Sequence, residues 1–208
     1  MTKLNAKHLN DAIIYAKNLI QHLPDTITYH CDAHTFEVVM PKAIELAKAE
    51  NLNDHQINLI GIAAVFHDTG FLKQYNHNEP IGAKYAIDYI QKSRFEFSEK
   101  DTHIIKEMIL NTDMQNSPKD IYQEIIRDAD LSYFGSNNFL TWIERLRIES
   151  LNFRESNLHE IAKYKTGWIS ASQTFISNQT WFTKSAETLW EKQKRLNLSL
   201  LKNTANEI

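Results

Sequence analysis

The sequence contains few of the residues that interrupt helices, and it has almost none of the residue that forms disulfides. Among 208 residues there are five glycines, four prolines and a single cysteine, Cys31. One cysteine excludes an internal disulfide and any zinc cluster built from several cysteines. Because so few glycines and prolines break the chain, and no segment alternates apolar and polar residues for long, we predict an all-α protein.

An excess of charge and a long apolar run are also missing. The formal net charge is −3 and the pI is near 6.3, so the chain offers no basic patch for nucleic acid and no basic face for a membrane surface. Its longest apolar run is far shorter than the roughly 18 residues of a spanning helix, and the amino terminus lacks a basic-then-apolar leader. We therefore expect a cytoplasmic protein without a nucleic-acid or membrane partner. Whether it forms a homo-oligomer stays open.

The apolar periodicity predicts a series of helices joined by short turns. The expected helices cover residues 5–22, a segment that begins between residues 29 and 32 and runs to 51, and then 54–68, 80–90, 98–110, 118–131, 139–151, 159–177 and 183–201. Pro41 should kink the second of these or make its first turns irregular, and Asp54 is the expected N-cap of the third. Without a repeat or linker, residues 1–208 should form a single compact helical domain. Its motif-bearing core spans about 29–135, and helices within 139–203 pack on it.

The segment Val65–Gly70 is the most informative part of the chain. It ends an apolar run that is too uniformly hydrophobic for a surface helix, and Gly70 comes where a helix usually stops. Asp68 would therefore lie at a buried helix C-terminus, where both the helix dipole and burial destabilise a carboxylate that has no cation beside it. A metal ion would remove both problems, and neutral His67 is its natural co-ligand.

Further potential ligands occur at two other places in the sequence. A catalytic divalent metal needs donors from different helices and open positions for water and substrate. His34, His67, Asp68 and one of Asp128 and Asp130 would supply two nitrogens and two oxygens. This set suits Mn, Fe, Co, Ni, Mg or Zn, and such an ion lowers the pKa of bound water toward about 7.

Periodicity does not choose between the two later aspartates. Residues two apart on a helix point about 200° away from each other, so one ion cannot easily bind both. Asp128 and Asp130 flank opposite edges of the apolar stripe of their helix. Both remain candidates on this ground.

The ordered set His34, His67-Asp68-Thr69-Gly70-Phe71 and Asp128-Ala129-Asp130-Leu131 resembles the HD superfamily of metal-dependent phosphohydrolases. The resemblance covers about residues 29–135 and implies a helical domain of HD/phosphodiesterase-like type. It also implies that the metal ligands are His34, His67, Asp68 and Asp130, and the choice of Asp130 rests on this resemblance alone.

The same resemblance implies a reaction. Metal-bound hydroxide would attack a small phosphomonoester or phosphodiester, and a nucleotide is the expected substrate. Asp68 would orient the attacking water or take its proton. A catalytically weak regulatory module that binds metal and nucleotide, an iron-dependent oxygenase-like relative and a metal-free helical scaffold are the alternatives.

The stretch Tyr29-His30-x-x-x-His34 resembles the opening motif of cyclic-nucleotide phosphodiesterases, Tyr-His-Asn-x-x-His, whose first histidine donates a proton to the leaving oxygen. Helical geometry would place His30 one turn from His34 on the same face, which makes His30 a candidate general acid. Cys31 replaces the asparagine of that motif, and Phe71 stands where the later His-Asp-x-x-His pattern has histidine.

A divalent ion with two carboxylates and two neutral imidazoles has no net charge and attracts a phosphate only weakly. An additional positive group or a second metal is therefore expected. Lys73, His77 and Arg127 lie near the proposed ligands in the sequence and are the candidates for phosphate binding. His77 could instead bind a second ion.

Overall fold

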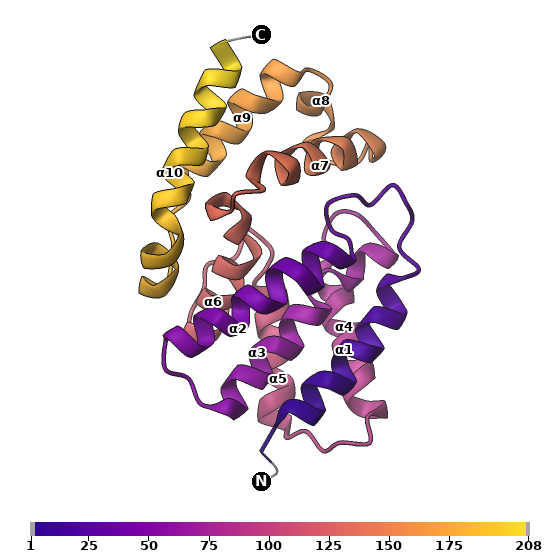
Figure 1. The fold of residues 1–208 in the computed structure, drawn as a ribbon. Coiled ribbons are helices and arrows are strands. Elements are labelled where there is room, and N and C mark those ends of the chain that lie inside the picture. Colours follow the sequence, from indigo (N-terminus) through magenta and orange to yellow (C-terminus); the bar gives the residue numbers. More distant parts are fainter. Residues whose placement is uncertain (1–2, 207–208) are drawn as a thin grey trace.

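The computed structural model describes residues 3–206, which form helices and turns without a β-strand (Figure 1). The elements are α1 (Ala6–Ile20), the π-helix η1 (Ala33–Val39), α2 (Met40–Ala49), α3 (Asp54–Phe66), the 3₁₀-helix η2 (Thr69–Leu72), α4 (Glu79–Lys92), α5 (Glu99–Leu110), α6 (Ile121–Asp130), the 3₁₀-helix η3 (Ser132–Gly135), α7 (Phe139–Asn152), α8 (His159–Ala162), α9 (Lys165–Asn178) and α10 (Lys184–Asn206). The predicted all-α class is confirmed. None of the described helices combines the length and the apolar composition needed to cross a membrane.

Helix α3 lies at the centre of the bundle formed by α1 to α6, because apolar residues cover its whole circumference. All residues from Asn58 to Phe66 are buried, and each of the other five helices contacts α3. Its N-cap is Asn53 rather than the expected Asp54. The Asn53 side chain accepts a hydrogen bond from the Gln56 N–H, and the Gln56 side chain accepts one from the Asn53 N–H. This reciprocal pair satisfies two backbone donors at once.

The second expected helix begins at the end of the range given for its start, and it is not uniform. Residues 29–31 form a bend, the first helical residue is Asp32, and regular α-helix starts only at Met40 after the π-helix η1. Pro41 has no N–H to donate to the carbonyl four residues earlier, and the preceding Met40 N–H bonds to the Thr35 carbonyl, five residues back. The expected disturbance around Pro41 is confirmed, whereas the helical position expected for His30 is wrong.

The apolar side chains form two hydrophobic cores. The main core fills the α1–α6 bundle, and the second core lies among η3, α7 and α9, where it includes Trp142 and Trp168. Helix α10 connects the two, since its Trp190 packs in the main core and its Leu201 packs in the second. In Figure 1, α7 crosses the top of the α1–α6 bundle, and α9 and α10 lie side by side.

The single helix predicted over residues 159–177 is divided in two. Tyr164 has extended backbone angles, and it separates α8 from α9. After this break Trp168 is buried in the second core and donates its indole N–H to the Ile143 carbonyl. Trp168 and Trp190 are core residues, whereas Phe175 and Leu196 remain 41% and 52% exposed.

Two glycines allow the start of α4 to lie against the end of α3. A Cβ on Gly70 would collide with the backbone carbonyl of Asn78. A Cβ on Gly82 would come within 2.9 Å of the carbonyl oxygens of Phe66 and His67. Gly70, which lies in η2 after α3 has ended at Phe66, is therefore required for close packing.

We expect Gly70→Ala to lower the free energy of unfolding by about 1–3 kcal/mol. The new Cβ would clash with the Asn78 backbone carbonyl, which can move away only if the start of α4 shifts with it. Urea denaturation measures this. The matched control is Gly167→Ala in α9, where the nearest atoms to the new Cβ lie 3.8 Å away and the gain in helix propensity makes the change neutral or stabilising. Equal stability of Gly70→Ala and the natural protein would contradict the packing argument.

Candidate metal centre

Four side chains from three separate helix ends meet at one point. His34 comes from η1, His67 and Asp68 follow α3, and Asp130 is the last residue of α6. The distances from His34 Nε2 to Asp130 Oδ1 and from His67 Nε2 to Asp68 Oδ2 are both 3.0 Å. The two crossed distances, His34 Nε2 to Asp68 Oδ2 and His67 Nε2 to Asp130 Oδ1, are 3.6 Å. The fold thus brings together all four residues selected from the sequence.

The hydrogen bond made by His67 indicates that this point needs a cation. His67 Nδ1 lies 2.7 Å from the Ala64 carbonyl oxygen, so Nδ1 carries a proton. In a neutral imidazole, Nε2 then presents a lone pair to the carboxylate oxygens of Asp68 and Asp130. Among the described residues, neither His67 Nε2 nor Asp68 Oδ2 has a hydrogen-bond partner, although both atoms are buried. Buried lone pairs that face one another at these distances favour a proton or a metal ion between them.

The pKa shifts have the same origin. Burial alone lowers the pKa of His67, but the charges and hydrogen bonds of Asp68 and Asp130 raise it well above its ordinary value. Burial alone raises the pKa of Asp130, but hydrogen bonds from His34 and His67 hold it far below its ordinary value. In the absence of metal, these shifts favour a second proton on the His67 imidazole. A metal ion would compete with this proton for the same lone pair.

The donor set fits a divalent ion. Two imidazole nitrogens and two carboxylate oxygens suit the borderline and hard metals of the first transition row and Mg²⁺. The ligand atoms of His34, His67 and Asp130 all lie within 4.8 Å of one another. The side chains of both histidines are fully buried, whereas that of Asp130 is 18% exposed and borders a cavity. This group could hold one ion with open positions toward the cavity.

Asp128 serves a different purpose from Asp130. Its carboxylate accepts hydrogen bonds from the Phe182 N–H at 3.0 Å and from the N–H and hydroxyl of Thr183, both at 2.8 Å. Asp128 thereby ties α6 to the segment that enters α10. Both of its oxygens are occupied in this contact, so of the two aspartates it is Asp130 that reaches the metal centre.

His30 lies beside the centre and is held by Glu149 of α7. His30 Nδ1 is 2.5 Å from Glu149 Oε1, and Glu149 Oε2 accepts the backbone N–H groups of Tyr29 and His30 at 2.7 and 3.1 Å. The Tyr75 hydroxyl donates to Oε1 at 3.2 Å, and Phe71 stacks on the imidazole with ring centroids 4.0 Å apart. These contacts occupy Nδ1 and leave Nε2 for the cavity that His30 lines.

The pair is charged in the folded protein. Burial alone lowers the pKa of His30, but Glu149 and, less strongly, Asp68 raise it above its ordinary value. Burial alone raises the pKa of Glu149, but the charge and hydrogen bond of His30 lower it below its ordinary value. His30 was expected to reach the site as a helical neighbour of His34. It reaches the site instead from the bend at 29–31, because Glu149 anchors that bend.

Glu149 was not foreseen, although the sequence contains a signal for it. It follows Trp142 by seven residues and Leu146 by three, so it falls on the apolar stripe of its helix. Its side chain is fully buried. An acidic residue on such a stripe needs a partner, and only the three-dimensional structure identifies His30 as that partner.

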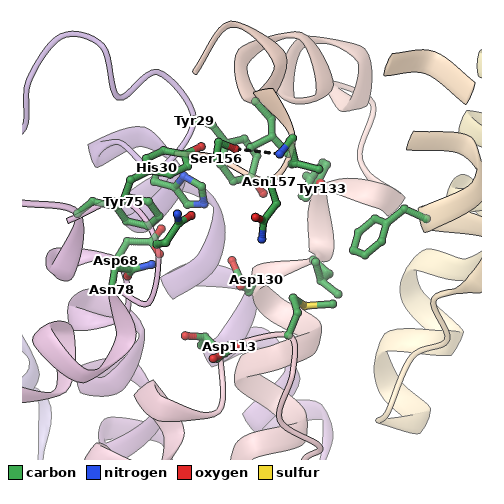
Figure 2. A pocket seen from close by; sticks show the side chains of 18 of the residues that line it. Tyr29, His30, Asp68, Tyr75, Asn78, Asp113, Asp130, Tyr133, Ser156 and Asn157 are labelled. Atoms are coloured by element: carbon green, nitrogen blue, oxygen red, sulfur yellow. Dashed lines mark hydrogen bonds between the residues drawn. The ribbon is translucent and has the colours of Figure 1, made fainter. Parts of the chain in front are cut away.

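The metal centre opens into a cavity of about 410 Å³ between the α1–α6 bundle and helices α7 and α9 (Figure 2). Asp68, Asp130 and His30 lie along one side, as Figure 2 shows. Ser156 and Asn157, from the loop before α8, also line the cavity, and Figure 2 shows Ser156 near His30.

Of the three residues proposed to bind phosphate, His77 alone borders the cavity. It is an exposed loop residue with a positive φ of 53°. Lys73 is exposed and does not line the cavity. Arg127 is 2% exposed, and its guanidinium donates to the backbone carbonyls of Asn111 and Asp113, as well as to that of residue 116. Arg127 therefore stabilises the turn between α5 and α6 rather than contacting a ligand.

No family model, curated protein or solved structure matches the chain.

The two aspartates give a direct test of the metal centre. We expect Asp130→Asn to weaken manganese binding by at least about 100-fold, because even residues that only support metal ligands change affinity by 10–100-fold. Asp128→Asn should keep the affinity and lower the free energy of unfolding by about 1–3 kcal/mol through its lost hydrogen bonds. Calorimetric titration of chelator-treated protein measures the first effect, and urea denaturation measures the second. Loss of manganese affinity in Asp128→Asn, with unchanged affinity in Asp130→Asn, would refute this description of the centre.

The His30–Glu149 pair should make stability depend on pH. Because the pKa of folded His30 lies above 6.5, its contribution is complete below about pH 6.5 and is lost as the pH rises through the raised value. Because the pKa of folded Glu149 lies below 4.5, its contribution is complete above about pH 4.5 and is lost as the pH falls through the lowered value. Glu149→Gln should therefore cost about 1 kcal/mol more at about pH 5.5 than at about pH 9.

Urea denaturation in the presence of chelator at these two pH values measures the difference. The control is the same substitution in a His30→Gln background, where the pH dependence of the cost should disappear. An equal cost at both pH values in the natural background would show that the pair is not charged.

Proposed function

We propose that the protein is a metal-dependent phosphohydrolase of HD type that cleaves a small phosphomonoester or phosphodiester, with a nucleotide as the favoured class of substrate. The observation that carries the proposal is the convergence of His34, His67, Asp68 and Asp130 at the edge of a cavity that also contains His30. The order of these residues along the chain, which resembles that of the HD superfamily, supports it further.

The four ligands would hold a divalent ion. When bound, such an ion polarises a phosphate oxygen and makes water more acidic. Asp68 both belongs to the ligand group and lines the cavity. Burial raises its pKa, but the charge of His67 and then that of His30 lower it below its ordinary value. Asp68 therefore stays ionised, and it can orient a water molecule and accept its proton.

His30 would complete the reaction as the general acid. Glu149 holds the Nδ1 side of the ring and keeps the imidazolium charged, so that Nε2 can donate a proton into the cavity. In the proposed step the water oxygen forms a bond to phosphorus and the bond from phosphorus to the alcohol oxygen breaks. The proton of the water passes to Asp68, and the proton of His30 passes to the leaving oxygen.

The test is turnover of aryl and alkyl phosphate esters with added manganese. We expect hydrolysis of p-nitrophenyl esters, and we expect His67→Ala and Asp68→Ala to reduce its rate by about 100-fold or more. His30→Gln should reduce the rate by about 100-fold for esters of simple alcohols, which need a proton on leaving. For p-nitrophenolate, which leaves without protonation, the loss should be less than about tenfold.

Asp128→Asn serves as the control for the assay, since that residue lies outside the reacting groups. An equal effect of His30→Gln on both classes of ester would remove His30 from the role of general acid. Manganese binding without turnover of any phosphate ester would instead favour the regulatory binding module.

A further inference from the structure

The cavity beside the metal centre has an apolar end. Its wall there consists of side chains from α7 and α9, namely Ile143, Leu146, Trp168, Phe175 and Ile176. Ile143, Trp168 and Ile176 belong to the second core and are buried, so the shape of this wall is fixed by packing. The Phe175 ring is 41% exposed and borders the same cavity. An exposed aromatic ring on a rigid apolar wall is a surface suited to an apolar part of a ligand.

The polar end carries acidic groups in excess of what the metal needs. Besides Asp68 and Asp130, the carboxyl groups of Glu79 and Asp113 line the cavity. In the part of the chain that the structure describes, no lysine or arginine side chain lines it. The guanidinium of Arg127 lies behind this wall and is hydrogen-bonded to the backbone of the turn between α5 and α6.

These charges set a limit on the charge of the substrate. A divalent ion is neutralised by Asp68 and Asp130, and His30 is neutralised by Glu149. Glu79 and Asp113 then share the Arg127 guanidinium behind the wall as a nearby positive charge, and one cation does not offset two carboxylates. Each additional negative charge on a phosphate group is repelled by them. A phosphomonoester carries about −1.5 to −2 charges at neutral pH, whereas a phosphodiester carries only one.

We infer that the substrate is a phosphodiester with a single negative charge, and that at least one of its two alcohols is apolar or aromatic. This inference rests on the proposed phosphohydrolase function. The phosphate group lies at the metal centre, and the apolar group lies against Phe175 and Trp168. Polyphosphates and phosphomonoesters are discriminated against by Glu79 and Asp113.

Three small anions with stable phosphorus–carbon bonds test the two features separately by binding alone. Methylphenylphosphinate has one charge and one ring, phenylphosphonate has the same ring with a second ionisable oxygen, and dimethylphosphinate has one charge and no ring. Calorimetric titration into the manganese-loaded protein should show methylphenylphosphinate binding about tenfold more tightly than phenylphosphonate, because carboxylates outnumber cations at this wall. It should also bind about tenfold more tightly than dimethylphosphinate, because of the buried ring.

Variants of the cavity wall should change these ratios selectively. Phe175→Ala should weaken binding of methylphenylphosphinate about fivefold and leave dimethylphosphinate unchanged. Phe182→Ala is the matched control, because that ring is equally exposed, at 44%, but does not line the cavity. Asp113→Asn should strengthen phenylphosphonate binding about threefold. An asparagine oxygen can still accept the Gln115 N–H bond that Asp113 accepts in its turn.

Tighter binding of phenylphosphonate than of methylphenylphosphinate would overturn the inference about charge. Equal effects of Phe175→Ala and Phe182→Ala would overturn the inference about the apolar group. Either result leaves the phosphohydrolase proposal standing, because manganese-dependent turnover is measured separately. Manganese binding without binding of any of the three anions would overturn both proposals.

Discussion

The structure is organised around one buried electrostatic arrangement whose facing lone pairs favour a proton or a metal ion between them. Two imidazoles and two carboxylates face one another where η1 begins and where α3 and α6 end, and His67 directs its second nitrogen toward acceptors because its first is bound to Ala64. Other parts of the fold hold this arrangement in place. Gly70 and Gly82 allow α4 to lie against the end of α3, and Asp128 fixes α6 to the segment that leads into α10.

Much of the fold could be predicted from the sequence. The scarcity of glycine and proline and the apolar periodicity indicated the helical class and most helix positions. The boundaries that failed depend on individual backbone groups. The capping box at Asn53 displaced the expected cap at Asp54, the bend at 29–31 follows from its anchoring on Glu149, and Tyr164 interrupts a pattern that is otherwise continuous. Helix boundaries such as these depend on particular hydrogen bonds and tertiary contacts, which the apolar periodicity of the sequence does not reveal.

Part of the candidate site could be predicted, because residue type and position along a helix indicated which side chains could bind a metal ion. A carboxylate at the C-terminal end of a buried apolar helix is expected to have a cation beside it. This expectation pointed to His67 and Asp68. The choice between Asp128 and Asp130 depended on which oxygens meet the Phe182 and Thr183 backbone, more than 50 residues away. The role of Glu149 was not predicted, because its partner, His30, lies 119 residues earlier in the chain. Arg127 shows the opposite error, since nearness in the sequence suggested a role in ligand binding that its buried position does not allow.

The two hydrophobic cores have a mechanical consequence for whatever enters the cavity. One wall of the cavity belongs to the α1–α6 bundle and the other to the layer of α7 and α9. A molecule bound in the cavity contacts both walls, so its binding energy opposes their separation. A bound molecule therefore stabilises the contact between the two layers. When the cavity is empty, local unfolding on heating, or cleavage by proteases, should begin between these layers.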